Sequence, residues 1–479
     1  MILNNPLIRR YRYSLMRPRQ FWIYLAIYIS VIMLLFFINY ASYQLQSWSG
    51  DLTRFFKGIY NQFLILQVIV LCILGAFNSG SAIKSEITGK SYDFFRLLPL
   101  SAGKKAVGIL VGKNFVVLLL AGINFLLLIT FGKLGKVDSS LLEQTFLALV
   151  SVAILLNSTT LLSSIRPVAK QKKSNVIVIV FFAFILIPFL INALMAAWFG
   201  ATQLHKLGIV LGKFYTIELP VLILFSLVVL YFSCWSIKGI LRRFTYEDES
   251  LFTRFGAYLF MLGFEFVLFG LFYTYLLDGT QETNYLFWLI SLLPVLLVPI
   301  WSCHSYEKYL ERSGLIQSRL PEGKNIMSQM LLYSNLFLCF GLFIIWALCS
   351  VVTTIIAGQD VLYNLYLIFI LFSFYLFLML LLELHVVYST HSNKIGLLLL
   401  FITAVYMILP IILSGIFESN VIYKQSPVGF VYELFPKSFG EDEVIVHPSI
   451  WVINFLLCVI PIMLIWKRYK HIIAARKKM

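Results

Sequence analysis

Few side chains in this sequence could carry out chemistry, and the ionisable ones that stand out lie inside long apolar runs. Glu265 lies near the middle of one run, and Glu383 and His385 lie toward the end of another. Charged side chains are costly inside a bilayer, so they often mark a path for protons or ions. The two glutamates could serve a proton- or sodium-coupled transporter. Alternatively, Glu265 finds a partner on a neighbouring helix, while Glu383 and His385 reach the membrane interface.

Nucleotide, metal and nucleophile chemistry all lack the residue patterns they need. Gly89-Lys90-Ser91 has the letters that end a phosphate-binding loop, but that motif needs a glycine five residues earlier, where this chain has Lys84. The six cysteines form no CxxC pair. No nucleophile lies beside a base. We therefore expect no catalytic, cofactor-binding or metal site and no enzyme activity in this chain. If ATP drives the protein, another chain must bind it.

The composition indicates lipid as the solvent. Of the 479 residues, 60% are hydrophobic and 13% are charged, whereas soluble domains have about 25% charged residues. One helix needs roughly 20 apolar residues to cross the hydrocarbon core. We predict an all-α, polytopic membrane helical bundle with about twelve transmembrane helices, at residues 21–41, 59–83, 107–131, 141–165, 175–200, 217–237, 255–277, 285–303, 329–356, 362–388, 395–416 and 449–466.

The distribution of positive charge predicts the orientation of the chain. The net charge is +16, but the basic residues lie in short loops between apolar runs and not in one contiguous segment. Placing both termini in the cytoplasm puts most of the 38 Lys and Arg residues on inner loops, as the positive-inside rule expects. We predict a multi-pass protein of the cell inner (plasma) membrane, with the lipid bilayer and not nucleic acid as its surroundings.

Two short segments outside the spans have amphipathic patterns. In the first, Asn5 can cap a helix that starts at Pro6. This helix is predicted to lie at the cytoplasmic interface, although an ordinary basic flank is the alternative. The apolar face of the predicted helix holds Leu7, Ile8, Tyr11 and Leu15, and Arg9 and Arg12 point away from this face.

The second amphipathic segment runs from Ser91 to Leu98. Its apolar side holds Phe94, Phe95, Leu97 and Leu98, and its polar side holds Asp93 and Arg96. Pro99 ends the helix, and Ser101 can cap the next one. Such a helix could dock its apolar side into a groove of a partner, or it could only rest on the membrane surface.

The same region holds a series of residues in a characteristic order: Glu86, Gly89, Phe94-Phe95, Leu97 to Ser101 and Gly112-Lys113. This series resembles the cytoplasmic loop of ABC type-2 permeases, the membrane subunits of ATP-driven exporters. In that family a glutamate ends the second span, a short coupling helix follows, and a turn leads to Gly-Lys at the third span. The opening residues from Asn5 to Arg12 also resemble the family's connecting helix. The resemblance covers about residues 1–130 and departs at Lys90 and Leu98, where the family usually has threonine.

The resemblance implies a division of labour between two chains. This chain would be the permease that forms the translocation pathway, and a dimer of a separate ABC ATPase, holding ATP and Mg, would bind on the cytoplasmic face. The implied ATPase-docking residues are Glu86, Gly89, Asp93, Phe94, Phe95, Pro99 and Ser101.

The family more often has six spans per chain, so twelve spans suggest two fused halves. We predict a first six-helix half at residues 1–240, with the N-terminal interfacial helix, and a second at 241–479. A second coupling loop would then hold Glu307, Tyr309, Leu320 and Pro321.

Two other functions fit the sequence. One is an ion-coupled secondary transporter with twelve spans, driven through Glu265 and Glu383. The other is a membrane-embedded transferase acting on a lipid-linked sugar. Such enzymes usually need a large polar loop beside the membrane, and only residues 417–448 could serve.

Overall fold

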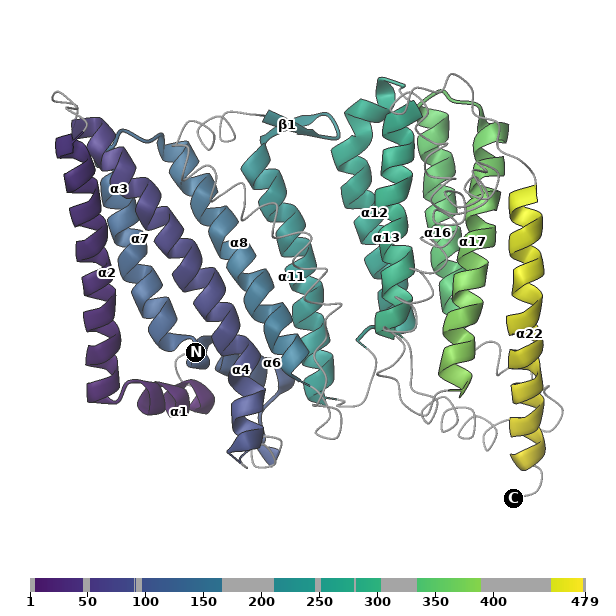
Figure 1. Ribbon diagram of the computed structural model, residues 1–479, viewed down its shortest axis with the longest axis horizontal. Coiled ribbons are helices and arrows are strands. Elements are labelled where there is room, and N and C mark those ends of the chain that lie inside the picture. Colours follow the sequence, from purple (N-terminus) through teal and green to yellow (C-terminus); the bar gives the residue numbers. More distant parts are fainter. Residues whose placement is uncertain are drawn as a thin grey trace, which may run out of the picture. The chain divides into compact units, whose positions relative to one another are not determined.

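The computed structural model describes residues 5–45, 52–89, 91, 97–165, 211–245, 251–279, 281–302, 334–388 and 449–476. These residues are mostly helical (Figure 1). The chain divides into two compact units, Met1–Glu249 and Ser250–Met479. The boundary predicted at residue 240 falls inside a helix, α11 (Val221–Thr245), which packs with the first unit. Whether the two units are repeats of one another stays a prediction.

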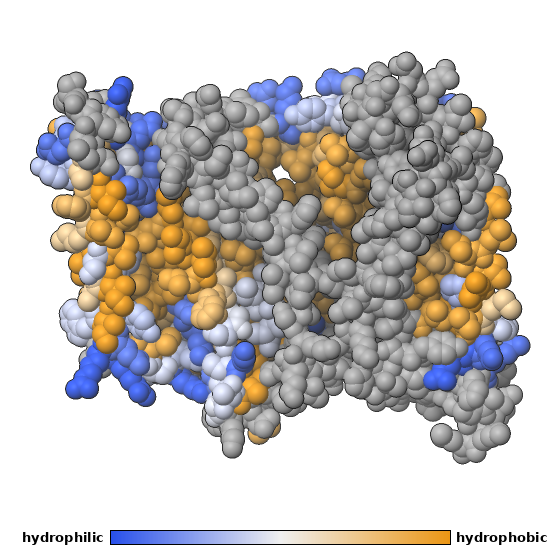
Figure 2. All heavy atoms as spheres, in the orientation of Figure 1, coloured by the Kyte–Doolittle hydropathy of each residue, from blue (hydrophilic) through white to orange (hydrophobic). Residues whose placement is uncertain are grey.

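Eight helical segments among the described residues are long and apolar enough to cross a membrane. The protein is therefore a multi-pass membrane protein built as a helical bundle. In the first unit, Figure 2 shows a broad apolar band with polar residues at both ends. The eight segments are Arg19–Ala41, Leu52–Thr88, Phe115–Leu134, Ser139–Ser164, Val221–Thr245, Arg254–Leu277, Asn335–Ile356 and Val361–Leu384.

The predicted count of twelve spans stays a prediction. Spans 175–200 and 395–416 lie outside the described residues. Spans 285–303 and 449–466 coincide with helices α13 (Gln281–Ser302) and α22 (Ser449–Arg476), which are not among the eight. The side of the membrane on which the termini lie is likewise a prediction.

The first unit begins with a short helix, and a longer helix follows it at a sharp angle (Figure 1). One continuous helix then contains α3, the π-helix η2 and α4. Its α3 portion packs chiefly against α7, whereas its α4 portion packs against α8. The helices are α1 (Pro6–Leu15), α2 (Pro18–Leu45), α3 (Leu52–Gln67), η2 (Val68–Leu74), α4 (Gly75–Thr88), α6 (Ala102–Lys113), α7 (Phe115–Leu134), α8 (Ser139–Ser164) and α11.

The third predicted span, 107–131, starts too early. Its first residues belong to α6, and the helix breaks at Asn114, whose φ of −92° and ψ of 10° are not helical. Lys104, Lys105 and Lys113 make α6 a poor membrane segment, and α6 packs against α1 instead. The apolar span therefore runs over Phe115–Leu134.

An all-α prediction misses one short hairpin before α11. Strand β1 (Leu211–Phe214) pairs antiparallel with β2 (Ile217–Pro220), with Leu211 opposite Pro220. The two-residue turn holds Tyr215 at a φ of 54°. Two-residue hairpin turns usually contain glycine or asparagine, and this turn, at residues 215 and 216, contains neither.

The second unit contains α12 (Arg254–Leu277), α13, α16 (Asn335–Ile356), α17 (Val361–Tyr388) and α22. Its core is aromatic. Trp288 and Trp346 pack edge to face with ring centroids 6.3 Å apart. The Trp346 indole N–H donates to Ser291 Oγ at 2.8 Å, so its one polar group is satisfied away from water.

Candidate functional site

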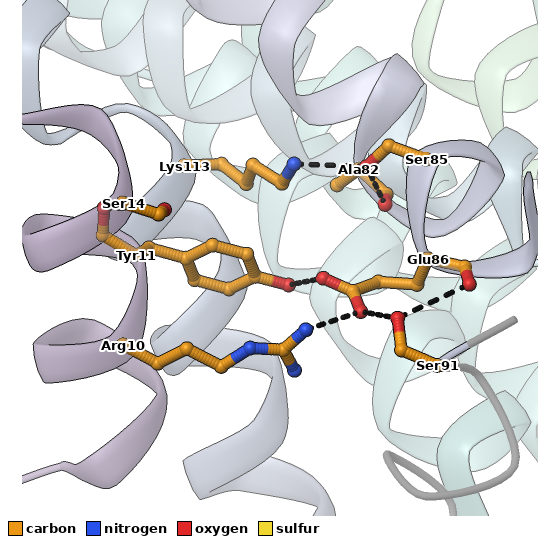
Figure 3. Close-up of polar contacts among 8 residues, drawn as sticks. All are labelled: Arg10, Tyr11, Ser14, Ala82, Ser85, Glu86, Ser91 and Lys113. Atoms are coloured by element: carbon orange, nitrogen blue, oxygen red, sulfur yellow. Dashed lines mark hydrogen bonds and ion pairs between the residues drawn. The ribbon is translucent and has the colours of Figure 1, made fainter. Parts of the chain in front are cut away.

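Glu86 is the centre of a polar cluster at one end of the first unit (Figure 3). It lies in the last turn of α4 and is 4% exposed. The Tyr11 hydroxyl donates to one carboxylate oxygen at 2.8 Å, and Arg10 Nη2 donates to the other at 2.9 Å. The Ser91 hydroxyl also donates to Glu86. A buried carboxylate is tolerated when it is paired and hydrogen-bonded, so Glu86 ties α1 to the end of α4.

The start of α1 is fixed to α6 by Asn5. The Asn5 side-chain oxygen accepts a hydrogen bond from the Leu7 N–H at 3.0 Å and caps the helix, while its Nδ2 donates to the Lys104 carbonyl at 2.7 Å. Pro6 occupies the first helical position, where no N–H is needed. One asparagine therefore starts α1 and attaches it to its neighbour.

Two glycines let α1 approach α6 closely. A Cβ atom at Gly108 would lie 2.8 Å from the Cβ of Leu7, and one at Gly112 would lie 2.7 Å from the ring of Tyr11. Such contacts are too short for any side chain larger than hydrogen. The Gly112 of the Gly-Lys pair is therefore needed because the Tyr11 ring packs directly against its backbone.

The location of α1 at the cytoplasmic interface stays a prediction, but the structure shows what its apolar face contacts. The apolar face of α1 is buried against protein and not left for lipid: Leu7, Ile8 and Tyr11 are at most 3% exposed, and Leu15 is partly buried. The reason is the groove that the two α6 glycines provide. Arg9 and Arg12 are exposed, as expected for the polar face.

Lys113 and Tyr11 complete the electrostatics around Glu86. Lys113 Nζ donates to Ser85 Oγ at 2.8 Å and lies 5.0 Å from the centroid of the Tyr11 ring. Burial lowers the pKa of Lys113, and the nearby Glu86 carboxylate opposes that change. Burial, and then the Glu86 charge, raise the pKa of Tyr11 well above its ordinary value. The Tyr11 hydroxyl therefore keeps its proton and acts as a donor.

The rest of the predicted docking loop is partly described. Gly89 ends α4, and its N–H donates to the Ser85 carbonyl at 3.0 Å. Ser101 caps α6, since its hydroxyl accepts from the Lys104 N–H at 3.4 Å. Between them, Leu98 and Leu100 on either side of Pro99 pack against a core to which α1, α4, α6, α8 and α11 contribute. Outside the described residues lie Asp93, Phe94 and Phe95, and also Glu307, Tyr309, Leu320 and Pro321 of the second predicted loop.

The two intramembrane glutamates have different surroundings. Glu383 is buried in α17, and one of its carboxylate oxygens accepts from the backbone N–H of Asn335 at 3.2 Å. Asn335 is the first residue of α16, so Glu383 satisfies a free N–H at a helix start, where negative charge is favoured. Glu265 in α12 is 3% exposed, and within the described chain neither of its carboxylate oxygens has a hydrogen-bond partner.

Sequence reasoning missed the role of Arg10 and the roles of Ser79 and Asn114. Arg10 had no expected role, yet it forms the ion pair with Glu86. A second group of hydrogen-bonded polar side chains consists of Ser79, Asn114 and Asn157. The Asn114 amide donates to the Ser79 hydroxyl at 2.8 Å, and the Ser79 hydroxyl donates to the Asn157 side-chain oxygen at 2.9 Å. The sequence predicts that Asn157, an asparagine inside a span, bonds to another helix, and its contact with Ser79 of α4 confirms this prediction.

No match to a known protein identifies this arrangement: the chain matches no protein-family model, no curated protein and no solved structure. Among the described residues, no group of three or more His, Cys, Asp and Glu side chains is placed to hold a metal ion.

Proposed function

We propose that this chain is the transmembrane permease subunit of an ABC transporter in the cell inner membrane. It forms the translocation pathway and is powered by a separate ATPase subunit, whose dimer binds ATP and Mg on the cytoplasmic face. In this proposal the permease chain itself is no enzyme.

The observation that carries the proposal is the convergence around Glu86. The permease-like positions are far apart in sequence, and Tyr11 lies 75 residues from the Glu86 that its hydroxyl contacts. They meet at the point where the chain leaves α4 for the proposed docking loop and returns to α6. Among the described residues, five of these positions pack or bond at that point: Glu86, Gly89, Ser101, Gly112 and Lys113.

The contacts suggest how a movement of the proposed docking loop would be transmitted to the helices. The loop is joined covalently to α4 at Gly89 and to α6 at Ser101. Glu86 and Asn5 fasten both helices to α1. Movement of the loop by an ATPase would therefore displace α1, α4 and α6 together and carry the membrane part of α4 with them.

Co-purification with an ATPase tests the proposal. The tagged chain, extracted from its own membranes in mild detergent, should bring with it a protein that hydrolyses ATP in the presence of Mg. Replacing Phe94→Asp and Phe95→Asp should lower the co-purified ATPase activity at least about tenfold, because charges cannot be buried unpaired in an apolar cleft. The melting temperature should stay at the wild-type value.

Phe94→Leu with Phe95→Leu is the matched control, since it keeps an apolar docking side and should retain most of the ATPase. An absence of Mg-dependent ATPase with the wild-type chain would contradict the proposal. So would undiminished ATPase with the aspartate variant.

A second candidate, an ion-coupled secondary transporter, is favoured by Glu265, whose carboxylate has no hydrogen-bond partner among the described residues. It predicts an ion-dependent transport current or flux that persists without ATP and is lost in Glu265→Gln. Glu383→Gln is the contrast, because the amide can still accept from Asn335 and should leave such a flux largely intact. Flux that requires ATP and survives Glu265→Gln would exclude this candidate.

A further inference from the structure

Four arginines form a cationic surface where α1 meets α2. This arginine corner consists of Arg9, Arg12, Arg17 and Arg19, all exposed. The fifth arginine of the region, Arg10, is neutralised by Glu86. In the part of the chain that the structure describes, none of the four forms an ion pair. No acidic residue precedes Asp51 in the sequence, so α1 and α2 carry no negative charge of their own.

Contacts and sequence place this corner at the boundary of the hydrocarbon core. Arg19 is the first residue of the span Arg19–Ala41, and Phe115 is the first residue of the span Phe115–Leu134. The Arg12 guanidinium lies 5.8 Å from the centroid of the Phe115 ring. Two spans therefore start at the level of the corner. In Figure 2, hydrophilic residues lie directly below the apolar band at the foot of α2.

An exposed aromatic side chain marks the same level. Trp22, one turn into the span, is 64% exposed. Tryptophan prefers the headgroup region of a bilayer, where its ring meets both acyl chains and polar groups. A molecule bound at the corner would thus meet cations on one side and an apolar ring on the other.

The burial of the apolar face of α1 decides what this helix offers to the membrane. Leu7, Ile8 and Tyr11 are covered by protein, so α1 does not enter the bilayer by hydrophobic insertion. Its outward side presents arginines. Guanidinium groups bind phosphate oxygens through paired hydrogen bonds, and juxtamembrane basic clusters attract anionic lipids.

We infer that the arginine corner binds the headgroup of an anionic phospholipid, with the acyl chains lying along α2 beside Trp22. The position at two span starts and the adjacent apolar ring favour a lipid over a free phosphate ion. The inference concerns the chain alone and does not depend on an ATPase partner.

Native mass spectrometry of the purified full chain tests it, with phosphatidylglycerol and phosphatidylcholine offered in equal amounts. The wild-type chain should retain phosphatidylglycerol preferentially. Arg12→Gln with Arg19→Gln should reduce the retained phosphatidylglycerol at least about tenfold and leave phosphatidylcholine unchanged, because only the anionic headgroup uses the charges.

Lys133→Gln with Lys136→Gln is the matched control. It removes the same charge from exposed sites at the far end of α7 and should leave lipid binding unchanged. Equal losses in the two double variants, or equal wild-type binding of both lipids, would overturn the inference. Displacement of the lipid by millimolar inorganic phosphate would show an ordinary phosphate site instead.

Two further measurements test the inference even if the Arg12→Gln, Arg19→Gln variant does not fold. Arg12→Lys with Arg19→Lys keeps the charge and should retain most of the lipid. With the wild-type chain, binding of phosphatidylglycerol should fall as NaCl is raised from low to high concentration, since salt screens exposed charges. Binding that is indifferent to salt would refute an electrostatic site.

Discussion

Glu86 and Glu383 are buried carboxylates that connect helices. Each accepts hydrogen bonds from a different helix, Glu86 from Tyr11 in α1 and Glu383 from the first N–H of α16. Removing one partner from a buried charge costs more than the average hydrogen bond, because the remaining group has lost its compensation. Individual side chains here therefore decide how helices are joined.

Tyr11→Phe should lower the free energy of unfolding by roughly 1–3 kcal/mol, since it removes a buried donor to a charged acceptor and keeps the ring. Denaturant or thermal unfolding in a defined detergent measures this. Tyr13→Phe is the matched control because Tyr13 is 77% exposed, and it should have no measurable effect. Similar losses at the two positions would contradict the role of the Glu86 contact.

The stabilisation from Tyr11 should also depend on pH. The pKa of Tyr11 is raised above its ordinary value of 10.0 by burial and by Glu86. A group with a raised pKa contributes its full stability below the unfolded pKa and loses it as the pH rises. The difference in stability between wild type and Tyr11→Phe should therefore be constant below pH 10 and shrink above it. A difference that grows with alkaline pH would reverse this sign.

At the scale of elements, the helix from Leu52 to Thr88 changes its packing partner halfway. The π-helix η2 lies where the helix passes from α7 to α8. Just before it, Gln67 accepts from Asn124 Nδ2 at 2.7 Å, and just after it, Gly75 lies against the side chain of Asn157. A π turn takes up one extra residue within an α-helix, which allows both contacts to form.

Deleting Ile69 from η2 should therefore convert it to an ordinary α-helix and retain both contacts, with a change in unfolding free energy of only about 1–2 kcal/mol. Deleting Leu118 from α7 is the control, because both side chains are 42% exposed but α7 has no extra residue to lose. That deletion should prevent folding, as it rotates the rest of the helix by about 100°. Size-exclusion profiles and melting curves compare the two, and equally severe effects would argue against the extra-residue account.

For the whole molecule, the eight apolar segments establish a multi-pass membrane protein, and the sidedness is a testable prediction. Lys104 lies in the first turn of α6, before α7 begins, whereas Lys136 follows the end of α7. A membrane-impermeant thiol reagent should label Lys136→Cys in intact cells and Lys104→Cys only after permeabilisation, because the positive-inside rule places Lys104 inside. The background should carry Cys234→Ser, since Cys234 is exposed. The reverse labelling would invert the orientation and remove the proposed ATPase-docking face.

The sequence by itself determined the class of the protein and many helix ends. Long apolar runs and loop charge are local properties, so lipid as the solvent and most span positions follow from them, as does the Asn5 cap on Pro6. The hairpin at Tyr215 and the start of the third span did not follow. The first lacks a turn residue, and the second depends on the packing of α6 against α1.

Only the tertiary structure decided which distant residues meet. Nothing local to Arg10 and Tyr11 says that they bond to a carboxylate 76 and 75 residues away, or that Gly108 and Gly112 make room for the apolar face of α1. Glu265 and Glu383 look alike in sequence. Glu383 accepts a hydrogen bond from the N–H at the start of a helix, whereas Glu265 has no hydrogen-bond partner among the described residues. Hydrophobic length is read along one segment, whereas the partner of a buried polar group is set by how segments pack.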